Sequence, residues 1–264
     1  MSFSKQVVWI TGASSGIGEA TAHLLAKKGA RLVLSARRQG ELERVKSDLG
    51  VDPTDVLVLP MDVEKPEEFP TLVEKVLATF GRIDILYNNA GISQRGGVLE
   101  SDLSVYQRLM EVNFYGVVAL TKAVLPTMIK QGSGLVAATS SVSGKLGSAK
   151  RSGYSASKHA LHGFFDALRA EVHRDGIQVT LICPGYIQTE ISKHALGPDG
   201  KAHGKMDQNQ AKGMPVEVCA QKIVRAFEKK TPEVYMGGFE VLGVYLKRFF
   251  PAILRRILVN EAPK

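Results

Sequence analysis

The sequence predicts a single α/β domain in which helices cover both faces of a doubly wound, parallel β-sheet. Short apolar runs alternate with helical patterns along most of the chain, which is typical of a parallel sheet buried on both faces. The length of 264 residues and the hydrophobic content of 44% suit one globular domain of this class. No fixed-period repeat or low-complexity tract interrupts the pattern, so we expect residues 1–264 to form one domain.

Each predicted strand is a short run of apolar and β-branched side chains between polar or glycine-containing stretches. In chain order the seven strands are expected at Gln6–Ile10, Arg31–Ser35, Val56–Leu59, Ile83–Tyr87, Gly134–Ser140, Ile177–Ile182 and Glu233–Met236. The stretches between the strands carry apolar residues at helical spacing. The clearest helices are expected at Gly18–Lys28, Tyr106–Ile129 and Tyr154–Arg174.

Charge and cysteine content narrow the possible functions. The formal net charge of +8 could attract nucleic acid, anionic lipid or an anionic small molecule. Because the basic residues do not gather in one tract and aromatic residues are only 7%, we expect no nucleic-acid partner. The two cysteines, Cys183 and Cys219, exclude a disulfide scaffold and suit a reducing compartment. The sequence shows no targeting pattern and no long apolar span, so a cytoplasmic location is expected.

A glycine-rich turn follows the first predicted strand. Residues 11–18 read Thr-Gly-Ala-Ser-Ser-Gly-Ile-Gly, and a helical pattern follows them. In such a strand–turn–helix unit the free N–H groups of the helix N-terminus bind a pyrophosphate. Gly12 permits a tight exit from the strand, Gly16 lets the backbone approach the phosphates, and Gly18 permits close helix packing. We therefore predict a dinucleotide site, to which Ser14, Ser15 and Ile17 also belong; an ordinary glycine-rich loop is the alternative.

The end of the second predicted strand indicates which dinucleotide is bound. A site for NAD has an Asp or Glu there that binds the ribose hydroxyls. Here the strand ends in Ser35-Ala36 and is followed by Arg37 and Arg38, with no acidic residue. Guanidinium groups suit a phosphate monoester. NADP(H) is therefore favoured over NAD(H), although the two arginines could simply be surface residues.

The turn is the first of seven motifs that together resemble the short-chain dehydrogenase/reductase family. They run from Gln6 to about Ile191 in the family's order. They are Thr-Gly-x3-Gly-Ile-Gly at 11–18, Asp62-Val63, Asn88-Asn89-Ala90-Gly91, Asn113, Ser141, Tyr154-x3-Lys158 and Pro184-Gly185 with Thr189. Each motif alone is weak, whereas all seven at family-like spacing are specific. The tracts Ser140–Lys145 and Tyr154–Lys158 look most like the hydroxysteroid-dehydrogenase-like branch, which uses NADP(H).

The resemblance implies four catalytic residues, each of which would be unremarkable alone. Tyr154 would be the general acid/base that exchanges a proton with the substrate oxygen. Lys158 would lie one helical turn away on the same face, favour the phenolate by its charge, and bind the cofactor ribose. Ser141 would donate a hydrogen bond to the substrate oxygen, although spacing alone does not separate it from the neighbouring serines. Asn113 would hold a water beside Lys158 in a proton relay.

The resemblance also implies the remaining cofactor contacts. The adenosine side would be lined by the chain after the fourth strand, namely Asn88, Asn89, Ala90 and Gly91. The chain under the nicotinamide would comprise Pro184, Gly185, Ile187 and Thr189. Asp62 would face the adenine, with Val63 offering backbone groups, and Asp62 could equally cap a helix. No metal is expected, because His159 and His162 form no cluster with carboxylates in the sequence.

Residues 190–214 are expected to form a substrate lid. Within them Ser192–Gly213 is the one long polar stretch that contains glycine. A loop of this length inside a compact domain is usually functional. Because this region varies in the family, it is where substrate identity would be encoded.

Residues 240–260 form a basic, amphipathic segment. Its apolar residues at helical spacing are Leu246, Phe249, Phe250, Ile253, Leu254, Ile257 and Leu258. Its interleaved basic residues are Lys247, Arg248, Arg255 and Arg256. Pro251 is expected to begin a helix. We expect the segment to roof the substrate pocket or pack on a second subunit, and peripheral contact with an anionic membrane is the alternative.

These observations predict a Rossmann-type domain with strand order 3-2-1-4-5-6-7. The expected function is NADP(H)-dependent interconversion of a secondary alcohol and a carbonyl on an apolar small molecule such as a steroid, retinoid or lipid. One alternative is an NAD-dependent dehydrogenase of a polar alcohol or sugar. The other is a noncatalytic NADP-binding sensor or scaffold. The resemblance implies a homodimer or homotetramer.

Overall fold

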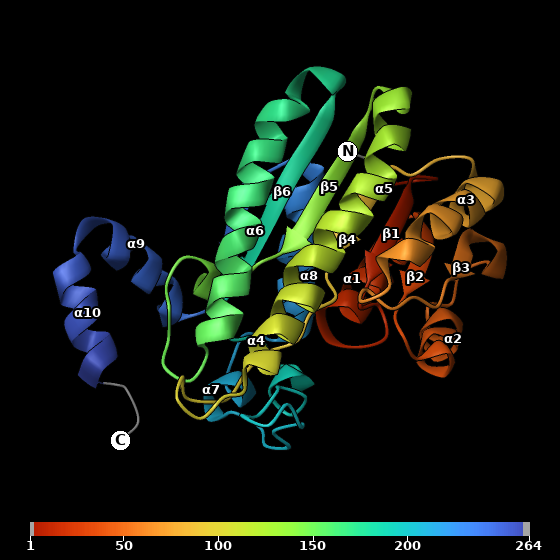
Figure 1. Cartoon of the computed structure of the whole chain (residues 1–264). Coiled ribbons are helices and arrows are strands. Elements are labelled where there is room, and N and C mark those ends of the chain that lie inside the picture. The colour runs from red at the N-terminus through yellow and green to blue at the C-terminus, as the bar shows by residue number, and fades with distance from the viewer. Residues whose placement is uncertain (1–2, 261–264) are drawn as a thin grey trace.

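The computed structural model describes residues 3–260 and confirms the predicted sheet (Figure 1). All seven strands are parallel and lie in the order β3-β2-β1-β4-β5-β6-β7. The strands are β1 (Val7–Thr11), β2 (Arg31–Ser35), β3 (Val56–Val58), β4 (Ile85–Asn88), β5 (Gly134–Thr139), β6 (Ile177–Pro184) and β7 (Glu233–Met236). The strand order reverses between β1 and β4. Ligands of such sheets bind outside the carboxyl ends of the strands at this point.

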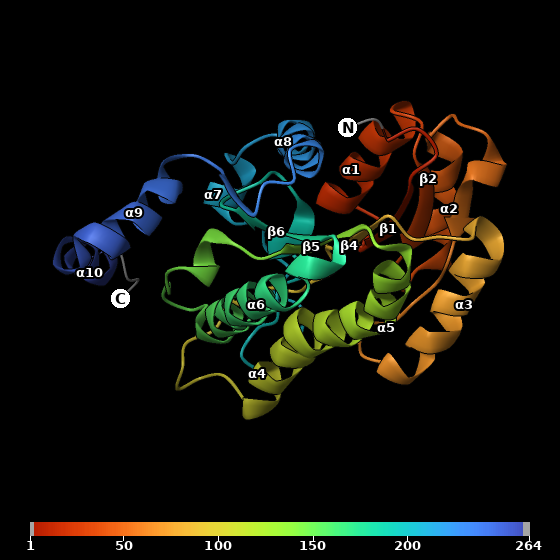
Figure 2. The ribbon, with the colours of Figure 1, turned by 90° about the horizontal axis from the view of Figure 1, so that it is seen from above.

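Helices cover both faces of the sheet (Figure 2). One face carries α1 (Gly16–Lys27), α2 (Gln39–Asp48) and α8 (Val216–Glu228). The other carries α3 (Phe69–Phe80), α5 (Gly116–Gln131) and α6 (Ser152–Glu171), with α4 (Leu103–Met110) packed against α6. Each face therefore has its own hydrophobic core, which explains why the strands are apolar at successive positions.

The central strands show how this double burial is achieved. All five residues of β1 are buried. Val8 and Ile10 belong to the core beneath α1, whereas Val7 and Trp9 belong to the core beneath α5. The Trp9 indole N–H donates to Ser35 Oγ of β2 at 2.9 Å, so its polar atom is satisfied inside the core.

The predicted helix Tyr106–Ile129 is wrong in one respect, because a π-helical turn at Glu111–Tyr115 separates α4 from α5. Asn113 lies in this turn and is fully buried. Its Oδ1 accepts from Ile92 N at 2.9 Å and its Nδ2 donates to Ile92 O at 2.9 Å. The widened turn thus carries a side chain that binds the neighbouring loop, as π-turns often do at functional sites.

Other helix boundaries differ slightly from those predicted. The first helix begins at Gly16 rather than Gly18, directly after the extended residue Ser15. The helix expected over Tyr154–Arg174 starts at Ser152 and ends at Glu171. A 3-10 turn follows it and leads to Gly176, whose φ of 74° is left-handed.

The run Leu103–Gln131 is long and apolar enough to span a membrane by length and composition. It comprises α4, the π-turn and α5, which pack against α3, α6 and the sheet. A core helix of an α/β domain has the same composition, so this run needs no membrane to explain it.

The C-terminal segment forms α9 (Leu242–Phe249) and α10 (Pro251–Asn260), which lie apart from the sheet (Figure 1). Pro251 begins a helix as predicted. Leu254 is 7% exposed and packs on Val142 and Leu146. The outward side chains of the segment include Phe249, Phe250, Ile253 and Ile257, all exposed.

Candidate active site

The glycine-rich turn has the geometry predicted for it. Gly12 and Gly16 adopt φ angles of 66° and 58°, which favour glycine. A Cβ on Gly18 would lie 2.2 Å from Gly12 O, so only glycine permits this approach of helix and turn. Asn89 Nδ2 donates to the carbonyls of Thr11 and Gly12, at 3.1 and 3.3 Å. Asn89, which follows β4, therefore holds the backbone of the turn in place.

The turn faces the segment after β6 across the switch point. A Cβ on Gly16 would come within 3.2 Å of Thr189 Cγ2, so the missing side chain keeps the gap between them open. Free N–H groups of the first turn of α1 lie at this gap. The geometry fits a dinucleotide whose phosphates bind the turn and whose nicotinamide lies near Pro184–Thr189.

The predicted adenosine end of the site is more open. Arg37 and Arg38 follow β2 after one residue, Ala36, and both are exposed. Asp62 is partly exposed, and its Oδ1 accepts from Glu64 N at 3.1 Å in a turn. It does not cap a helix, because the 3-10 helix that follows is Pro66–Glu68 and its N-cap residue is Lys65. Val63 Cβ packs against Gly116, where any side chain would clash.

The four predicted catalytic residues lie together at the carboxyl ends of β4 and β5. Tyr154 and Lys158 share one face of α6, with Lys158 Nζ 5.9 Å from the centre of the Tyr154 ring. Ser141 lies just after the end of β5 and lines the same pocket as Tyr154. Asn113 Nδ2 also donates to Ser157 Oγ at 3.0 Å, which fixes it beside α6. A Cβ on Gly91 would meet Asn113 Oδ1 at 3.0 Å and Lys158 Nζ at 3.5 Å.

Burial and charge set the proton affinities of these groups. Burial raises the pKa of Tyr154 above that of free tyrosine, while the Ser141 hydroxyl and the Arg151 and Arg95 guanidiniums lower it in part. Burial also lowers the pKa of Lys158 to about 8. Its ammonium donates to Thr139 O at 2.7 Å. The arginines were missed in the sequence, which pointed only to Lys158 as the charge beside Tyr154.

Comparison with known proteins decides the family. A family model described as short chain dehydrogenase matches residues 6–197. A protein from Drosophila melanogaster, named dehydrogenase/reductase SDR family protein 7-like, is 44% identical over 264 residues, covering 98% of this chain and 81% of the relative. The chain belongs to the short-chain dehydrogenase/reductase family. It is therefore an oxidoreductase of a family that binds NAD or NADP.

Solved structures agree with the fold of a short-chain dehydrogenase/reductase. A family member from Burkholderia phymatum in complex with NAD superposes with a TM-score of 0.79 over 100% of this chain and 98% of that chain. At 24% identity it shows the fold alone. An alcohol dehydrogenase from the archaeon Thermococcus sibiricus, complexed with 5-hydroxy-NADP, is 28% identical with a TM-score of 0.75, covering 89% of this chain and 97% of that chain.

A pocket opens beside the dehydrogenase/reductase residues Ser141 and Tyr154. Its apolar lining comprises Ile17, Val142, Leu146, Pro184, Ile187 and Ile191. Its polar lining includes Ser93, Arg95, Arg151, Gln210 and Glu240. The Glu240 carboxylate accepts from Tyr186 N at 2.8 Å and Gly238 N at 3.1 Å, so it is already bound by backbone. The pocket thus joins an apolar wall to a few charged groups.

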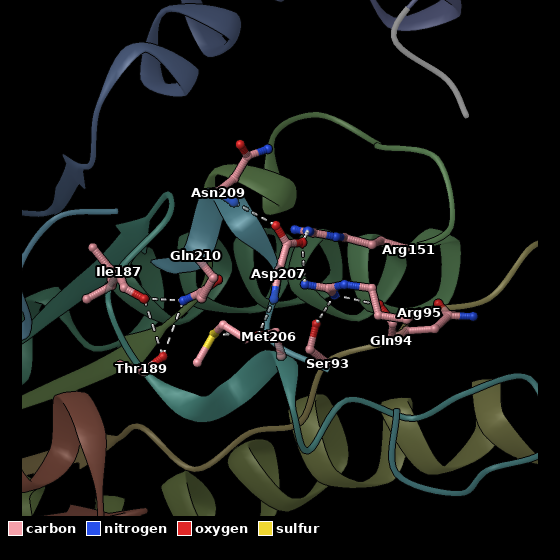
Figure 3. A network of polar contacts seen from close by, with 11 residues as sticks. Ser93, Gln94, Arg95, Arg151, Ile187, Thr189, Met206, Asp207, Asn209 and Gln210 are labelled. Atoms are coloured by element: carbon pink, nitrogen blue, oxygen red, sulfur yellow. Dashed lines mark hydrogen bonds and ion pairs between the residues drawn. The ribbon is translucent and has the colours of Figure 1, made fainter. Parts of the chain in front are cut away.

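Ile191 and Gln210, from the segment predicted to be a lid, line this pocket. A 3-10 turn at Glu190–Ser192 and the short helix α7 (Gln208–Ala211) lie within residues 190–214. Leu196 packs with Val105 and Leu109 near Tyr154. Figure 3 shows Asp207 between Arg95 and Arg151, and Gln210 directed toward Ile187 and Thr189. No local motif marks these partners.

A second polar cluster lies next to Ser140, at the carboxyl end of β5. His162, Cys183 and Glu233 bring their ligand-type atoms within 4.8 Å of one another. The sequence predicted no carboxylate near His162. That prediction is wrong, because β7 places Glu233 Oε2 3.6 Å from His162 Nδ1. Lys145 Nζ already lies 3.2 Å from the same oxygen, and Ser140 Oγ lies 2.9 Å from His162 Nε2.

Proposed function

We propose that this oxidoreductase uses NADP(H) to interconvert a secondary alcohol and a carbonyl on an apolar small molecule. The observation that carries the proposal is the convergence of Ser141, Tyr154, Lys158 and Asn113 beside a pocket with an apolar wall. Bound nicotinamide supplies the hydride or accepts it.

The chain's own residues manage the proton. In the oxidative direction the Tyr154 phenolate takes the hydroxyl proton of the substrate, and in reduction the phenol returns it to the carbonyl oxygen. Ser141 Oγ now donates to Pro184 O at 3.1 Å and accepts from Ser143 N. Since a hydroxyl has one proton, Ser141 must turn from Pro184 to donate to the substrate oxygen. Lys158 would favour the phenolate of Tyr154 by its positive charge. Asn113 would hold a water beside Lys158 in the proton relay.

The NADP preference rests on the end of β2. Residues 36–40, which follow β2, include no acidic side chain, and the exposed Arg37 and Arg38 would bind a 2′-phosphate near the adenosine. NAD(H) with a polar alcohol or sugar is the alternative, in which both arginines are bystanders. A noncatalytic NADP-binding protein is the other alternative, and it has no need of four converging catalytic groups.

The test is a fluorescence titration of NADPH and NADH against the wild type and Arg37→Ala. We expect NADPH to bind at least about tenfold more tightly, equivalent to about 1.4 kcal/mol, and Arg37→Ala to remove most of this gap. Arg174→Ala, an exposed arginine near the amino end of β6, is the matched control. Equal or tighter binding of NADH by the wild type would overturn the NADP assignment.

We also propose two roles for the C-terminal helices. Their inner face supports the pocket, because Leu254 packs on Val142 and Leu146, which line it. Their outer face, with exposed Phe249, Phe250 and nearby basic residues, would make peripheral contact with an anionic membrane in an otherwise cytoplasmic protein. Co-sedimentation with phosphatidylserine vesicles tests this contact. A homodimer or homotetramer stays a prediction. If a second subunit packed on the outer face of α9 and α10, it would cover the residues proposed to contact the membrane.

A further inference from the structure

The side chain of Asp207 ties the lid to two arginines beside Tyr154 (Figure 3). Its Oδ2 accepts from Arg151 Nη2 at 2.7 Å and from Arg95 Nη2 at 3.1 Å. Its Oδ1 accepts from Asn209 N at 2.9 Å and caps α7. The three side chains are only 12 to 21% exposed. Charge-assisted hydrogen bonds of this kind are stronger than those between neutral groups.

A second contact holds the other end of the same short helix. The Gln210 side chain is buried and donates to Ile187 O and to Thr189 Oγ1, the latter at 3.2 Å. Asp207 and Gln210 therefore fix α7 at both ends. One end is bound to the arginines near Tyr154, and the other to the segment where the nicotinamide is expected.

The loop after β4 connects this lid contact to the catalytic helix. Gln94 is fully buried, and its Oε1 accepts from Gly153 N at 2.8 Å and Tyr154 N at 3.2 Å. The next residue is Arg95, which also donates to Ser93 Oγ at 3.0 Å. The backbone of Arg95 and Ser93 pairs with Leu196 of the lid. Two successive side chains thus bind the first turn of α6 and the lid.

We propose that Asp207 is the latch of the lid and that Arg95 and Arg151 are positioning residues that couple lid closure to Tyr154. The proposal rests on the proposed function only in taking this pocket as the substrate site. With the lid closed, one carboxylate partly neutralises two guanidiniums. With the lid open, both positive charges remain near Tyr154 without that carboxylate.

The charges around Tyr154 determine the expected effects. Arg151 belongs to the residues just before α6, Arg95 to the loop after β4, Lys158 to α6 and Asp207 to the lid. Glu240, from the segment after β7, also lines the pocket. Removing the negative charge of Asp207 lowers the pKa of Tyr154, whereas removing the positive charge of Arg151 raises it.

The experiment compares Asp207→Asn and Arg151→Gln with the wild type, all loaded with NADP+. Asparagine keeps an oxygen to cap α7 but loses the charge. Hydrogen exchange followed by mass spectrometry should show roughly tenfold faster uptake over residues 190–214 in both variants. Asp199→Asn is the control, because Asp199 is an exposed carboxylate of the same segment that binds Lys201 and neither of the two arginines. Unchanged exchange in both latch variants would overturn the latch.

An ultraviolet titration of the Tyr154 phenolate, with Tyr154→Phe as the blank, tests the coupling without any substrate. Both variants break the Arg151–Asp207 ion pair, and Arg151→Gln leaves the Arg95–Asp207 pair in place. The two variants remove charges of opposite sign, which shift the pKa of Tyr154 in opposite directions. The midpoint should lie at least about half a pH unit lower in Asp207→Asn than in Arg151→Gln. Equal midpoints would reduce the arginines to a structural role.

Hexanoate provides the last arm of the test. If hexanoate binds Asp207→Asn more tightly than the wild type and opens the wild-type lid, the arginines form a substrate-anion site. That result would overturn the proposal that Arg95 and Arg151 hold the lid through Asp207. Because exchange and titration need no turnover, failure of the latch is distinguishable from failure of the proposed enzymatic function.

Discussion

The glycine-rich turn and residues 190–214, the proposed lid, both contribute side chains to one pocket and are built in different ways. The turn at residues 11–18 depends on backbone geometry, because Gly12 and Gly16 have left-handed φ angles and Gly18 approaches Gly12 O. The lid depends on side chains that meet across long stretches of chain. Asp207 binds Arg95 and Arg151, which precede it by 112 and 56 residues.

This difference explains which side could be recognised from sequence. Backbone constraints leave local patterns, since only glycine tolerates the required angles and approaches. A side-chain pair distant in sequence leaves no local pattern. The glycine-rich turn should therefore be most sensitive to an added atom, and the substrate side of the pocket to a removed one.

The largest effect is expected from removing one atom on the substrate side. Tyr154→Phe deletes the phenolic oxygen and should lower turnover about 10³-fold or more, because general acid/base catalysis contributes this much. NADPH affinity, measured by fluorescence titration, should stay within about twofold, since the turn is intact. Steady-state kinetics on a panel of apolar ketones measures the loss. Full activity in the variant would mean that another group donates the proton, and absence of turnover in the wild type on every substrate of the panel would favour the noncatalytic alternative.

Much of the fold was predictable because local signals agreed. Every strand lies within two residues of its predicted range, and the strand order is as expected. The π-turn at Glu111–Tyr115 was missed, because no local pattern marks it and its Asn113 binds Ile92 in a distant loop. The proximity of Glu233 to His162 was also missed, because the two residues are far apart in the sequence and the fold alone brings β7 close to α6.

Adding one atom on the cofactor side should be nearly as damaging. The Cβ of Gly18→Ala would lie 2.2 Å from Gly12 O and 2.7 Å from Asn89 Nδ2. Because Gly12 belongs to the turn and Asn89 binds the turn's carbonyls, we expect a cost of about 3 kcal/mol in unfolding free energy and more than tenfold weaker NADPH binding.

Gly40→Ala is the matched control for that change. Gly40 also lies in a helix, α2, and a Cβ there meets nothing within 4 Å. Alanine should be neutral or stabilise by up to about 1 kcal/mol. Urea unfolding measures both variants, and equal stabilities would show that the turn does not need the close approach of Gly18.

The smallest of the three effects concerns the side-chain cluster next to Ser140. Burial alone would raise the pKa of Glu233, but His162, Tyr235 and Lys145 outweigh it and lower the pKa to about 2 from 4.5. This difference corresponds to about 3 kcal/mol, reduced to about 2 kcal/mol because a quarter of the side chain is exposed. The unfolded state binds the proton more readily, so this stability is present above pH 4.5 and is lost as the pH falls toward 2.

Glu233→Gln should therefore lower the unfolding free energy by about 2 kcal/mol at pH 7, and the difference from the wild type should shrink as the pH falls below 4.5. Glu228→Gln is the control, because Glu228 meets Lys28 on the surface at 2.9 Å and should cost less than about 1 kcal/mol. Urea unfolding across pH 3–7 measures both. A pH-independent loss in Glu233→Gln would mean that the carboxylate acts by packing rather than by charge. In that case the cluster around Glu233 would be stabilised by side-chain packing, much as the glycine-rich turn depends on close backbone approach.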